Sequence, residues 1–92
     1  MHSLRIAVIG AGSTYTPELI NGFIQRKDRL KVDSFAFCDT DGDRCEVLAS
    51  LTERMLRRAG IIARVERYDD FRAAVRGADY IITQIRVGKM PA

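Results

Sequence analysis

The chain has 92 residues and a mass of 10.3 kDa, which allows one small hydrophobic core. Hydrophobic residues make up 47% and charged residues 29%, the balance of a folded globular protein rather than of a disordered chain. The net charge of +3 is spread among interspersed acids and bases, and no apolar run reaches the length of a membrane-spanning helix, so we expect neither nucleic acid nor a membrane as partner. Two cysteines are too few for a disulfide scaffold, which favours a cytoplasmic location.

The first half of the chain reads as strand, helix, strand. Leu4–Ile9 and residues 34–38 are short apolar runs, predicted as strands that are buried on both faces. Phe35 and Phe37 of the second run are expected to be core residues on opposite faces. The apolar residues between the two runs repeat at helical spacing, and Thr16 is the expected N-cap of that helix.

The second half continues the alternation. An amphipathic helix is predicted over residues 43–59, and a strand over residues 61–68 whose mixed polarity suits the edge of a sheet. Asp70 is expected to cap a short helix whose Phe71 faces inward. The last strand is predicted over residues 78–85. Strands that alternate with helices indicate a parallel sheet with right-handed crossovers.

The expected fold is therefore α/β, a Rossmann-like, doubly wound parallel sheet with strand order 3-2-1-4. In this order the fourth strand is an edge if the chain ends at Ala92, yet Tyr80, Ile81 and Ile82 are typical of a strand with two neighbours. We therefore expect residues 1–92 to be a truncated N-terminal domain, the first half of the full sheet. The alternative is a complete four-stranded domain whose edge is covered or dimerised.

A glycine-containing turn follows the first strand. Gly10 and Gly12 permit a tight turn and a close approach of a diphosphate to the backbone, and the following helix offers unpaired N–H groups. Ser13 and Thr14 add hydroxyl donors. Tyr15 occupies the third glycine position of G-x-G-x-x-G, so the dinucleotide-binding pattern is incomplete. An ordinary glycine turn between a strand and a helix is the alternative.

An acidic residue follows the second strand. Asp39 lies 27 residues after Gly12, where a carboxylate accepts hydrogen bonds from the adenosine ribose, and its negative charge favours NAD over NADP. Asp41 competes for this role, but it also suits the N-cap of the next helix. Arg44 is either a contact for a 2′-phosphate or a solvated helix residue.

The fourth strand leads into the segment TQIRVGK, residues 83–89. Arg86 is placed where ligands bind in open parallel sheets, and its guanidinium suits an anionic group such as a phosphate. A surface arginine is the alternative interpretation. The chain offers no candidate metal cluster, and neither Cys38 nor Cys45 has a neighbouring histidine with which to form a nucleophilic pair.

Two motifs of this sequence resemble glycoside hydrolase family 4. The first is the segment IGAGSTYTPELI, residues 9–20, in which YTPEL is most similar to the 6-phospho-β-glucosidase branch; the second is TQIRVG, residues 83–88. The resemblance implies a fold like that of lactate and malate dehydrogenases, with NAD and a divalent metal, usually manganese, as cofactors. It also implies hydrolysis of 6-phosphorylated β-glucosides or disaccharides by successive oxidation, elimination, addition and reduction.

The same resemblance assigns roles to residues of this chain. Gly10, Gly12, Ser13 and Thr14 correspond to the cofactor loop, and Arg86 to an arginine that meets the substrate phosphate. The metal ligands and the base of the family lie further along the chain, so we expect no catalytic residue and no metal ligand here, and an inactive 92-residue chain. The whole enzyme would be a cytoplasmic homo-oligomer.

Two other functions compete with this one. The first is a stand-alone nucleotide-binding module without catalytic activity. The second is another dehydrogenase-like enzyme, such as a hydroxy-acid dehydrogenase, against which the Arg-Val-Gly motif argues.

Overall fold

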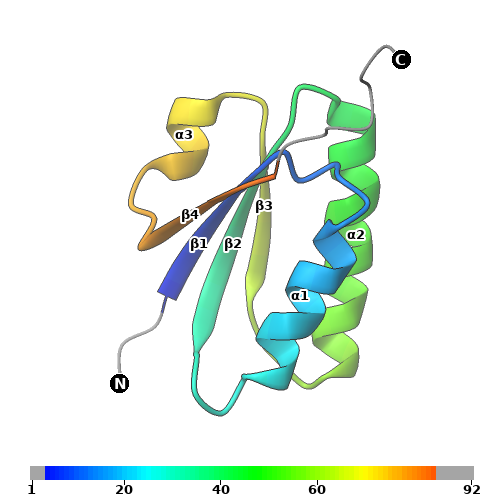
Figure 1. Cartoon of the computed structure of the whole chain (residues 1–92), viewed down its shortest axis with the longest axis vertical. Coiled ribbons are helices and arrows are strands. Elements are labelled where there is room, and N and C mark those ends of the chain that lie inside the picture. The colour runs from blue at the N-terminus through cyan, green and yellow to red at the C-terminus, as the bar shows by residue number, and fades with distance from the viewer. Residues whose placement is uncertain (1–3, 85–92) are drawn as a thin grey trace, which may run out of the picture.

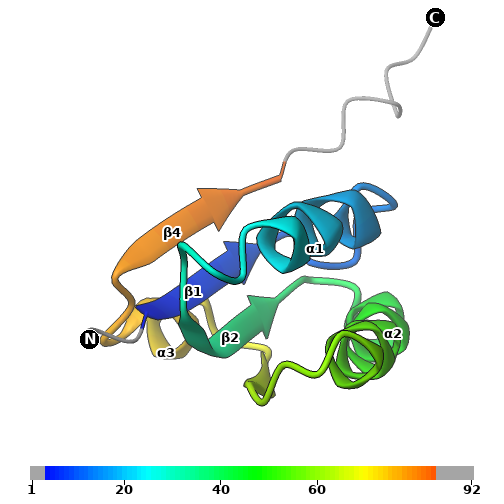
Figure 2. The same cartoon turned by 90° about the horizontal axis from the view of Figure 1, so that it is seen from below.

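The computed structural model describes residues 4–84, which form a four-stranded sheet with helices on both faces (Figures 1 and 2). The elements in chain order are β1 (Leu4–Ile9), α1 (Thr16–Gln25), β2 (Val32–Cys38), α2 (Gly42–Arg58), β3 (Arg64–Tyr68), α3 (Phe71–Val75) and β4 (Tyr80–Thr83). No helix within this range has the length and apolarity that crossing a membrane requires.

The sheet has the strand order β3-β2-β1-β4, and each neighbouring pair is parallel. The predicted fold class and strand order are thus confirmed. Because all four strands run the same way, their carboxyl ends lie at one edge, the upper edge in Figure 1. The loop from β1 to α1, the turn from β2 to α2 and the link from β3 to α3 all leave the sheet at this edge.

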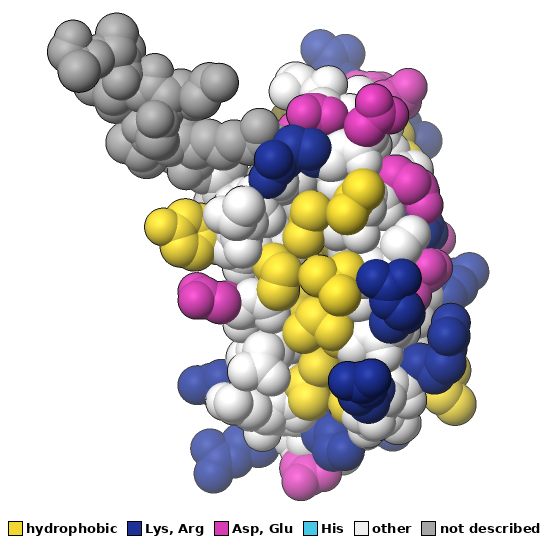
Figure 3. All heavy atoms as spheres, turned by 90° about the vertical axis from the view of Figure 1, so that its right-hand side faces the viewer, with side chains coloured by type: hydrophobic (Ala, Val, Ile, Leu, Met, Phe, Trp, Pro, Cys, Tyr) yellow, Lys and Arg dark blue, Asp and Glu magenta, His cyan; other side chains and the backbone are white. Residues whose placement is uncertain are grey.

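The larger part of the core lies between the sheet and the helices α1 and α2. Phe35 and Phe37 both belong to this core, and the Phe35 ring packs edge-to-face on Phe23 of α1 with centroids 5.5 Å apart. The expectation that Phe35 and Phe37 face opposite ways is wrong, because side chains two residues apart on a strand share a face. Figure 3 shows apolar side chains reaching the surface as a stripe on the face formed by α1 and α2.

The opposite face of the sheet is covered by the short helix α3. Ala7, Ala36 and Cys38 pack there against Ala74, and these small side chains allow the helix to lie close to the strands. The prediction that Phe71 faces inward is wrong, because Phe71 is 54% exposed. Phe71 is the first residue of α3, and it lines a cavity together with Ile9 and Cys38 rather than joining the core.

Two of the three expected helix caps are confirmed. Asp41 and Asp70 each accept a hydrogen bond from a backbone N–H in the first turn of the following helix. Thr16 is not the N-cap of α1, since Tyr15 holds that position without a side-chain cap. The Thr16 hydroxyl instead donates to the Ala11 carbonyl oxygen at 2.8 Å, so it fastens the helix to the preceding loop.

The ends of three strands differ from the sequence prediction. β2 begins two residues earlier than expected, at Val32, and β3 begins at Arg64 rather than at Ile61. Ile61 is apolar because it packs against the core from an unpaired segment, so its character does not report strand pairing. β4 is shorter than predicted, and the last residue of its expected range, Ile85, lies outside the described residues.

Candidate functional site

The loop after β1 depends on a glycine at its first position. Gly10 has a φ of +85°, and a Cβ atom there would collide with the carbonyl oxygen of Gln84, the residue that follows β4. The N–H groups of Gly10 and Ala11 both donate to the carbonyl oxygen of Cys38, at 2.7 and 3.1 Å. The loop is therefore held between the ends of β2 and β4.

The backbone of Gly12 is held by two charged side chains, one from the end of β2 and one from the first turn of α2. The N–H of Gly12 donates to Asp39 Oδ2 at 2.7 Å, while Arg44 Nε donates to the Gly12 carbonyl oxygen at 2.9 Å. Asp39 Oδ1 accepts the N–H of Asp41 at 2.8 Å, and the Asp39 residue is only 9% exposed. Both carboxylate oxygens of Asp39 thus accept backbone N–H groups.

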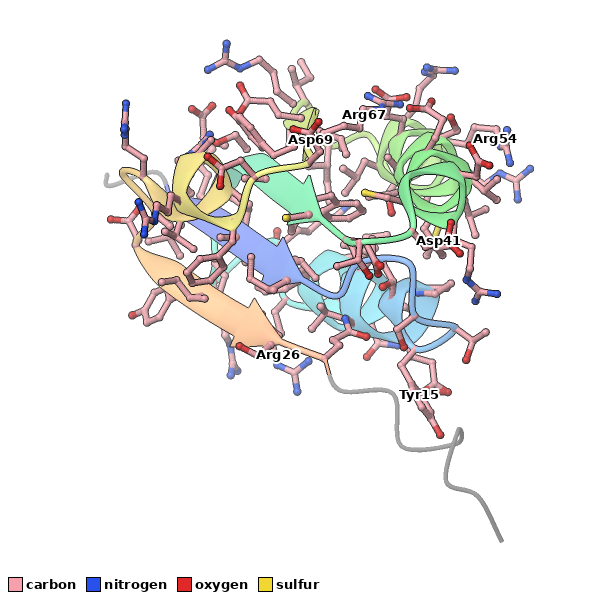
Figure 4. The ribbon with its side chains drawn as sticks, turned by 90° about the horizontal axis from the view of Figure 1, so that it is seen from above. Tyr15, Arg26, Asp41, Arg54, Arg67 and Asp69 are labelled. Carbon is pink, nitrogen blue, oxygen red and sulfur yellow. The ribbon has the colours of Figure 1, made fainter. Side chains whose placement is uncertain are left out.

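The start of α1 provides further donors. The Ser13 side-chain oxygen accepts the N–H of Tyr15 at 3.1 Å, whereas the N–H of Thr14 has no acceptor within residues 4–84. A free N–H beside a helix N-terminus favours an anion. Tyr15, at the third glycine position, is 67% exposed and its side chain points away from the sheet (Figure 4), so the incomplete pattern causes no clash with the strands.

A cavity of about 390 Å³ opens at the same edge, between the glycine loop and the β3–α3 link. Its lining residues are Ile9, Gly10, Cys38, Asp39, Thr40, Asp69, Phe71 and Gln84. Figure 4 looks onto this edge and labels Asp41 and Asp69 on two of its connections. A second cavity, of about 410 Å³, lies at the opposite edge, around the amino end of β2 and the carboxyl ends of α1 and α2. Ligands of open α/β sheets bind at the carboxyl edge, so the 390 Å³ cavity is the candidate site.

The two cysteines have neither the exposure nor the acidity of a nucleophile. Both are buried, and burial raises the pKa of Cys38 and raises that of Cys45 to about 11, with the Asp39 charge contributing at both sites. Within residues 4–84 no group of three or more His, Cys, Asp or Glu side chains is arranged to hold a metal ion.

Comparison with known proteins decides the family. The model of the Family 4 glycosyl hydrolases matches residues 5–92, nearly the whole chain. The chain is a member of glycosyl hydrolase family 4. The resemblance carried by its two sequence motifs is thereby confirmed.

Several relatives of the chain are 6-phospho-glucosidases. The chain is 38% identical to a 6-phospho-beta-glucosidase of Escherichia coli (strain K12), over 97% of the chain and 20% of the relative. It is 40% identical to a probable 6-phospho-beta-glucosidase of Bacillus subtilis (strain 168), over 97% of the chain and 21% of the relative. The structure of the 6-phospho-beta glucosidase from Thermotoga maritima with NAD and glucose-6-phosphate superposes with a TM-score of 0.83 at 34% identity, covering 95% of the chain and 20% of that protein. The chain thus spans about a fifth of the length of these family 4 enzymes.

The five residues predicted to bind the cofactor lie together in this family 4 chain. Gly10, Gly12, Ser13 and Thr14 form the β1–α1 loop, and Asp39 contacts that loop from the end of β2. Their proximity is a finding, while their contact with a cofactor stays a prediction.

Three other features bear on the site. Arg86, the predicted phosphate contact, lies outside the described residues. Arg44 is an exposed residue of α2, in agreement with the solvated-helix interpretation. It also donates to the glycine loop, a contact that no local pattern indicates because Arg44 and Gly12 are 32 positions apart. The burial of the Gln84 carboxamide, within the TQIRVG motif, is not predicted from the sequence either.

Proposed function

We propose that these residues form the NAD-binding N-terminal part of a 6-phospho-β-glucosidase that requires NAD and a divalent metal. The observation that carries the proposal is the glycine loop, ordered by Asp39 and Arg44 and open to a cavity at the carboxyl edge of the sheet. The absence of a Cβ at Gly10 lets the loop lie against β4, which is the close packing that a diphosphate-binding turn needs. Family membership supports the same conclusion.

The residues present fit a dinucleotide. The N–H of Thr14 and the hydroxyls of Ser13 and Thr14 would bind the diphosphate at the start of α1. The Asp39 carboxylate would accept the ribose hydroxyls, and its charge would repel a 2′-phosphate. When bound, NAD supplies the acceptor and donor of hydride that the family reaction uses. The chain's own residues bind and orient it.

Within residues 4–84 no group of three or more His, Cys, Asp or Glu side chains could hold the metal. A 6-phospho-alpha-glucosidase structure contains NAD and Mn²⁺, and a Thermotoga maritima structure contains manganese, NAD⁺ and glucose-6-phosphate. We propose that manganese is bound in the whole protein by residues outside this chain, where the base would also lie.

The proposed substrate is a 6-phosphorylated β-glucoside. The β-specific relatives share 35–40% of their aligned residues with the chain, whereas a 6-phospho-alpha-glucosidase of Leptotrichia buccalis shares 28%. An alpha-galactosidase of Rhizobium meliloti shares 33% of its aligned residues with the chain. The assay therefore has to test both the preference for the β-anomer and the requirement for a 6-phosphate on the substrate.

The direct assay is release of p-nitrophenol from its 6-phospho-β-glucoside by the whole protein. We expect turnover that requires NAD and Mn²⁺ and that stops when either is removed. The 6-phospho-α-glucoside and the unphosphorylated β-glucoside should react far more slowly, and the 92-residue chain alone should be inactive. Faster cleavage of the α-anomer or of an unphosphorylated galactoside would contradict the assignment.

Arg86 is the proposed contact for the substrate phosphate. Arginine binds a phosphate through two parallel N–H donors and lysine through one point charge, so Arg86→Lys should lower kcat/KM for the phosphorylated substrate about 100-fold. The affinity for NAD should barely change, and Arg58→Lys, at an exposed position on α2, is the control. If Arg86→Lys instead weakens NAD binding and spares substrate kinetics, Arg86 belongs to the cofactor site.

A further inference from the structure

The 390 Å³ cavity lies on the α3 side of the strand ends. Ile9 and Cys38, which line it, pack with the apolar cluster under α3 and not with the core under α1 and α2. The glycine loop leads from the same edge to the start of α1, on the other face of the sheet (Figure 2). A molecule that is bound at the start of α1 and that reaches this cavity therefore crosses the ends of β1 and β2.

Asp39 lies on that path. Its carboxylate accepts the N–H of Gly12 in the glycine loop at 2.7 Å, and the residue also lines the cavity. In a dinucleotide the ribose joins the diphosphate to the base, so a diphosphate at α1 and a ribose at Asp39 direct the base onward into the cavity. Its wall there includes Asp69, and Figure 4 shows Asp69 and Tyr15 of the α1 start on opposite sides of the ends of β1 and β2.

Phe71 contributes an aromatic residue that the core does not use. It is 54% exposed, it belongs to neither of the apolar clusters on the two faces of the sheet, and it lines the cavity. Aromatic side chains stack on the faces of nucleic-acid bases, and this contact tolerates any base because every base has a π-face. Phe71 therefore suits the face of a base and would add affinity without selecting which base is bound.

Asp69 contributes a carboxylate that no described residue binds. Within the described part of the chain it takes part in no hydrogen bond and no ion pair, whereas the neighbouring Asp70 accepts the N–H of Arg72 as a helix cap. Burial raises the pKa of Cys38 and the charge of Asp69 contributes, so the Asp69 carboxylate lies near the wall that Cys38 forms. A carboxylate only accepts hydrogen bonds. It therefore pairs with an amine on the edge of a base and is repelled by a carbonyl oxygen.

We propose that this cavity binds the adenine base of the dinucleotide, with Phe71 against the face of the base and Asp69 accepting a hydrogen bond from the N6 amine. This inference rests on the proposed function, because it assumes that the ligand of the site is NAD. It divides the work between the two residues: Phe71 provides affinity, and Asp69 selects a base that carries an amine.

The test is calorimetric titration of the whole protein with NAD and with nicotinamide hypoxanthine dinucleotide, in which a carbonyl replaces the N6 amine. The wild type should bind NAD at least about 10-fold more tightly than the hypoxanthine analogue. Asp69→Asn should bind the two dinucleotides alike, because a carboxamide can turn to donate to the carbonyl. Asp28→Asn, at an exposed position at the opposite edge of the sheet, should keep the wild-type preference.

Phe71→Ala should weaken binding of both dinucleotides about 10-fold and leave the preference between them unchanged. Phe71→Tyr keeps an aromatic ring and should bind like the wild type. Because Phe71 and Asp69 are exposed, both ligand-free variants should unfold thermally near the wild-type temperature.

The results that would overturn the inference differ from those that would overturn the proposed function. Unchanged NAD affinity in Phe71→Ala, or an Asp69→Asn variant that still prefers NAD about 10-fold, would contradict the inference alone. If the wild type binds NAD and the analogue equally, Asp69 does not read the base, although the proposed function stands. If the wild type binds neither, both proposals fail.

Discussion

Gly12 shows how the glycine loop is ordered by the protein itself. Its N–H is held by Asp39, which follows β2, and its carbonyl oxygen by Arg44, in the first turn of α2. A hydrogen bond to an ionised group is stronger than one between neutral groups, and both contacts here are of this kind. The loop therefore needs little reordering when a ligand binds, which lowers the entropic cost of binding.

Alanine substitutions at Gly10 and Gly60 can be compared to test how closely the glycine loop packs against the end of β4. Both have a positive φ, but a Cβ would meet the Gln84 carbonyl oxygen at Gly10 and nothing within 4 Å at Gly60. Gly60→Ala should cost about 1 kcal/mol of unfolding free energy through the backbone alone. Gly10→Ala should cost about 3 kcal/mol, because steric overlap adds to the backbone term. Urea unfolding of both variants checks this, and equal losses would show that the loop can move away from β4.

At the scale of elements, α2 is tied to the edge strand β3 by one arginine. Arg67 Nε lies 2.9 Å from Glu46, and Arg67 Nη2 lies 3.1 Å from Glu53, both on α2. Hydrogen bonds from Arg67 hold the pKa of each glutamate below its ordinary value of 4.5. A carboxylate with a lowered pKa stabilises the fold above that ordinary value and loses its contribution as the pH falls through the lowered pKa.

Arg67→Met should therefore lower the free energy of unfolding at pH 7 and have a much smaller effect near pH 3. The expected loss is modest, since all three side chains are partly exposed and water screens their attraction. Arg58→Met, at an exposed position on α2, is the control, and its effect on stability should show no such pH dependence. The measurement is denaturant unfolding of both variants at pH 7 and near pH 3. If Arg67→Met lowers the free energy of unfolding equally at both pH values, Arg67 acts through packing of its methylene groups.

The helices and inner strands could be predicted from the sequence because their signals are local. Apolar periodicity located α1 and α2, and short side chains with acceptor oxygens located the caps at Asp41 and Asp70. The hydrogen bonds from Gly12 to Asp39 and from Arg44 to Gly12 could not be predicted. They join residues that are 27 and 32 positions apart in the sequence, and only the folded sheet brings them together.

At the scale of the whole molecule, β4 is an edge strand of the sheet that residues 4–84 form, with β1 as its neighbour there. Tyr80 and Ile81 are 60% and 52% exposed, as expected for an apolar strand that lacks its second neighbour. The chain spans about a fifth of its relatives' length, so the protein in which it occurs has room for further strands if it matches them. We propose that another segment of the whole protein pairs with β4.

Hydrogen exchange tests this proposal. In the whole protein, the amides of β4 that point away from β1 should exchange much more slowly than in the 92-residue chain, because a new strand would accept their hydrogen bonds. The amides of β2, which has neighbours on both sides, should differ far less and serve as the internal control. Equal exchange of β4 in the two proteins would mean that its edge stays open.

The central claim is that the carboxyl edge of this sheet binds NAD through the glycine loop and Asp39. Calorimetric titration of the whole protein with NAD and NADP tests it most directly, with Asp39→Asn as the variant because asparagine keeps one acceptor oxygen for the loop. Asp33→Asn, at an exposed position on β2, the strand that Asp39 follows, is the control. We expect one NAD per chain, NADP binding at least about 10-fold weaker, and loss of this preference in Asp39→Asn alone. A wild type that binds neither dinucleotide, or an Asp39→Asn variant that still prefers NAD as strongly, would contradict the account.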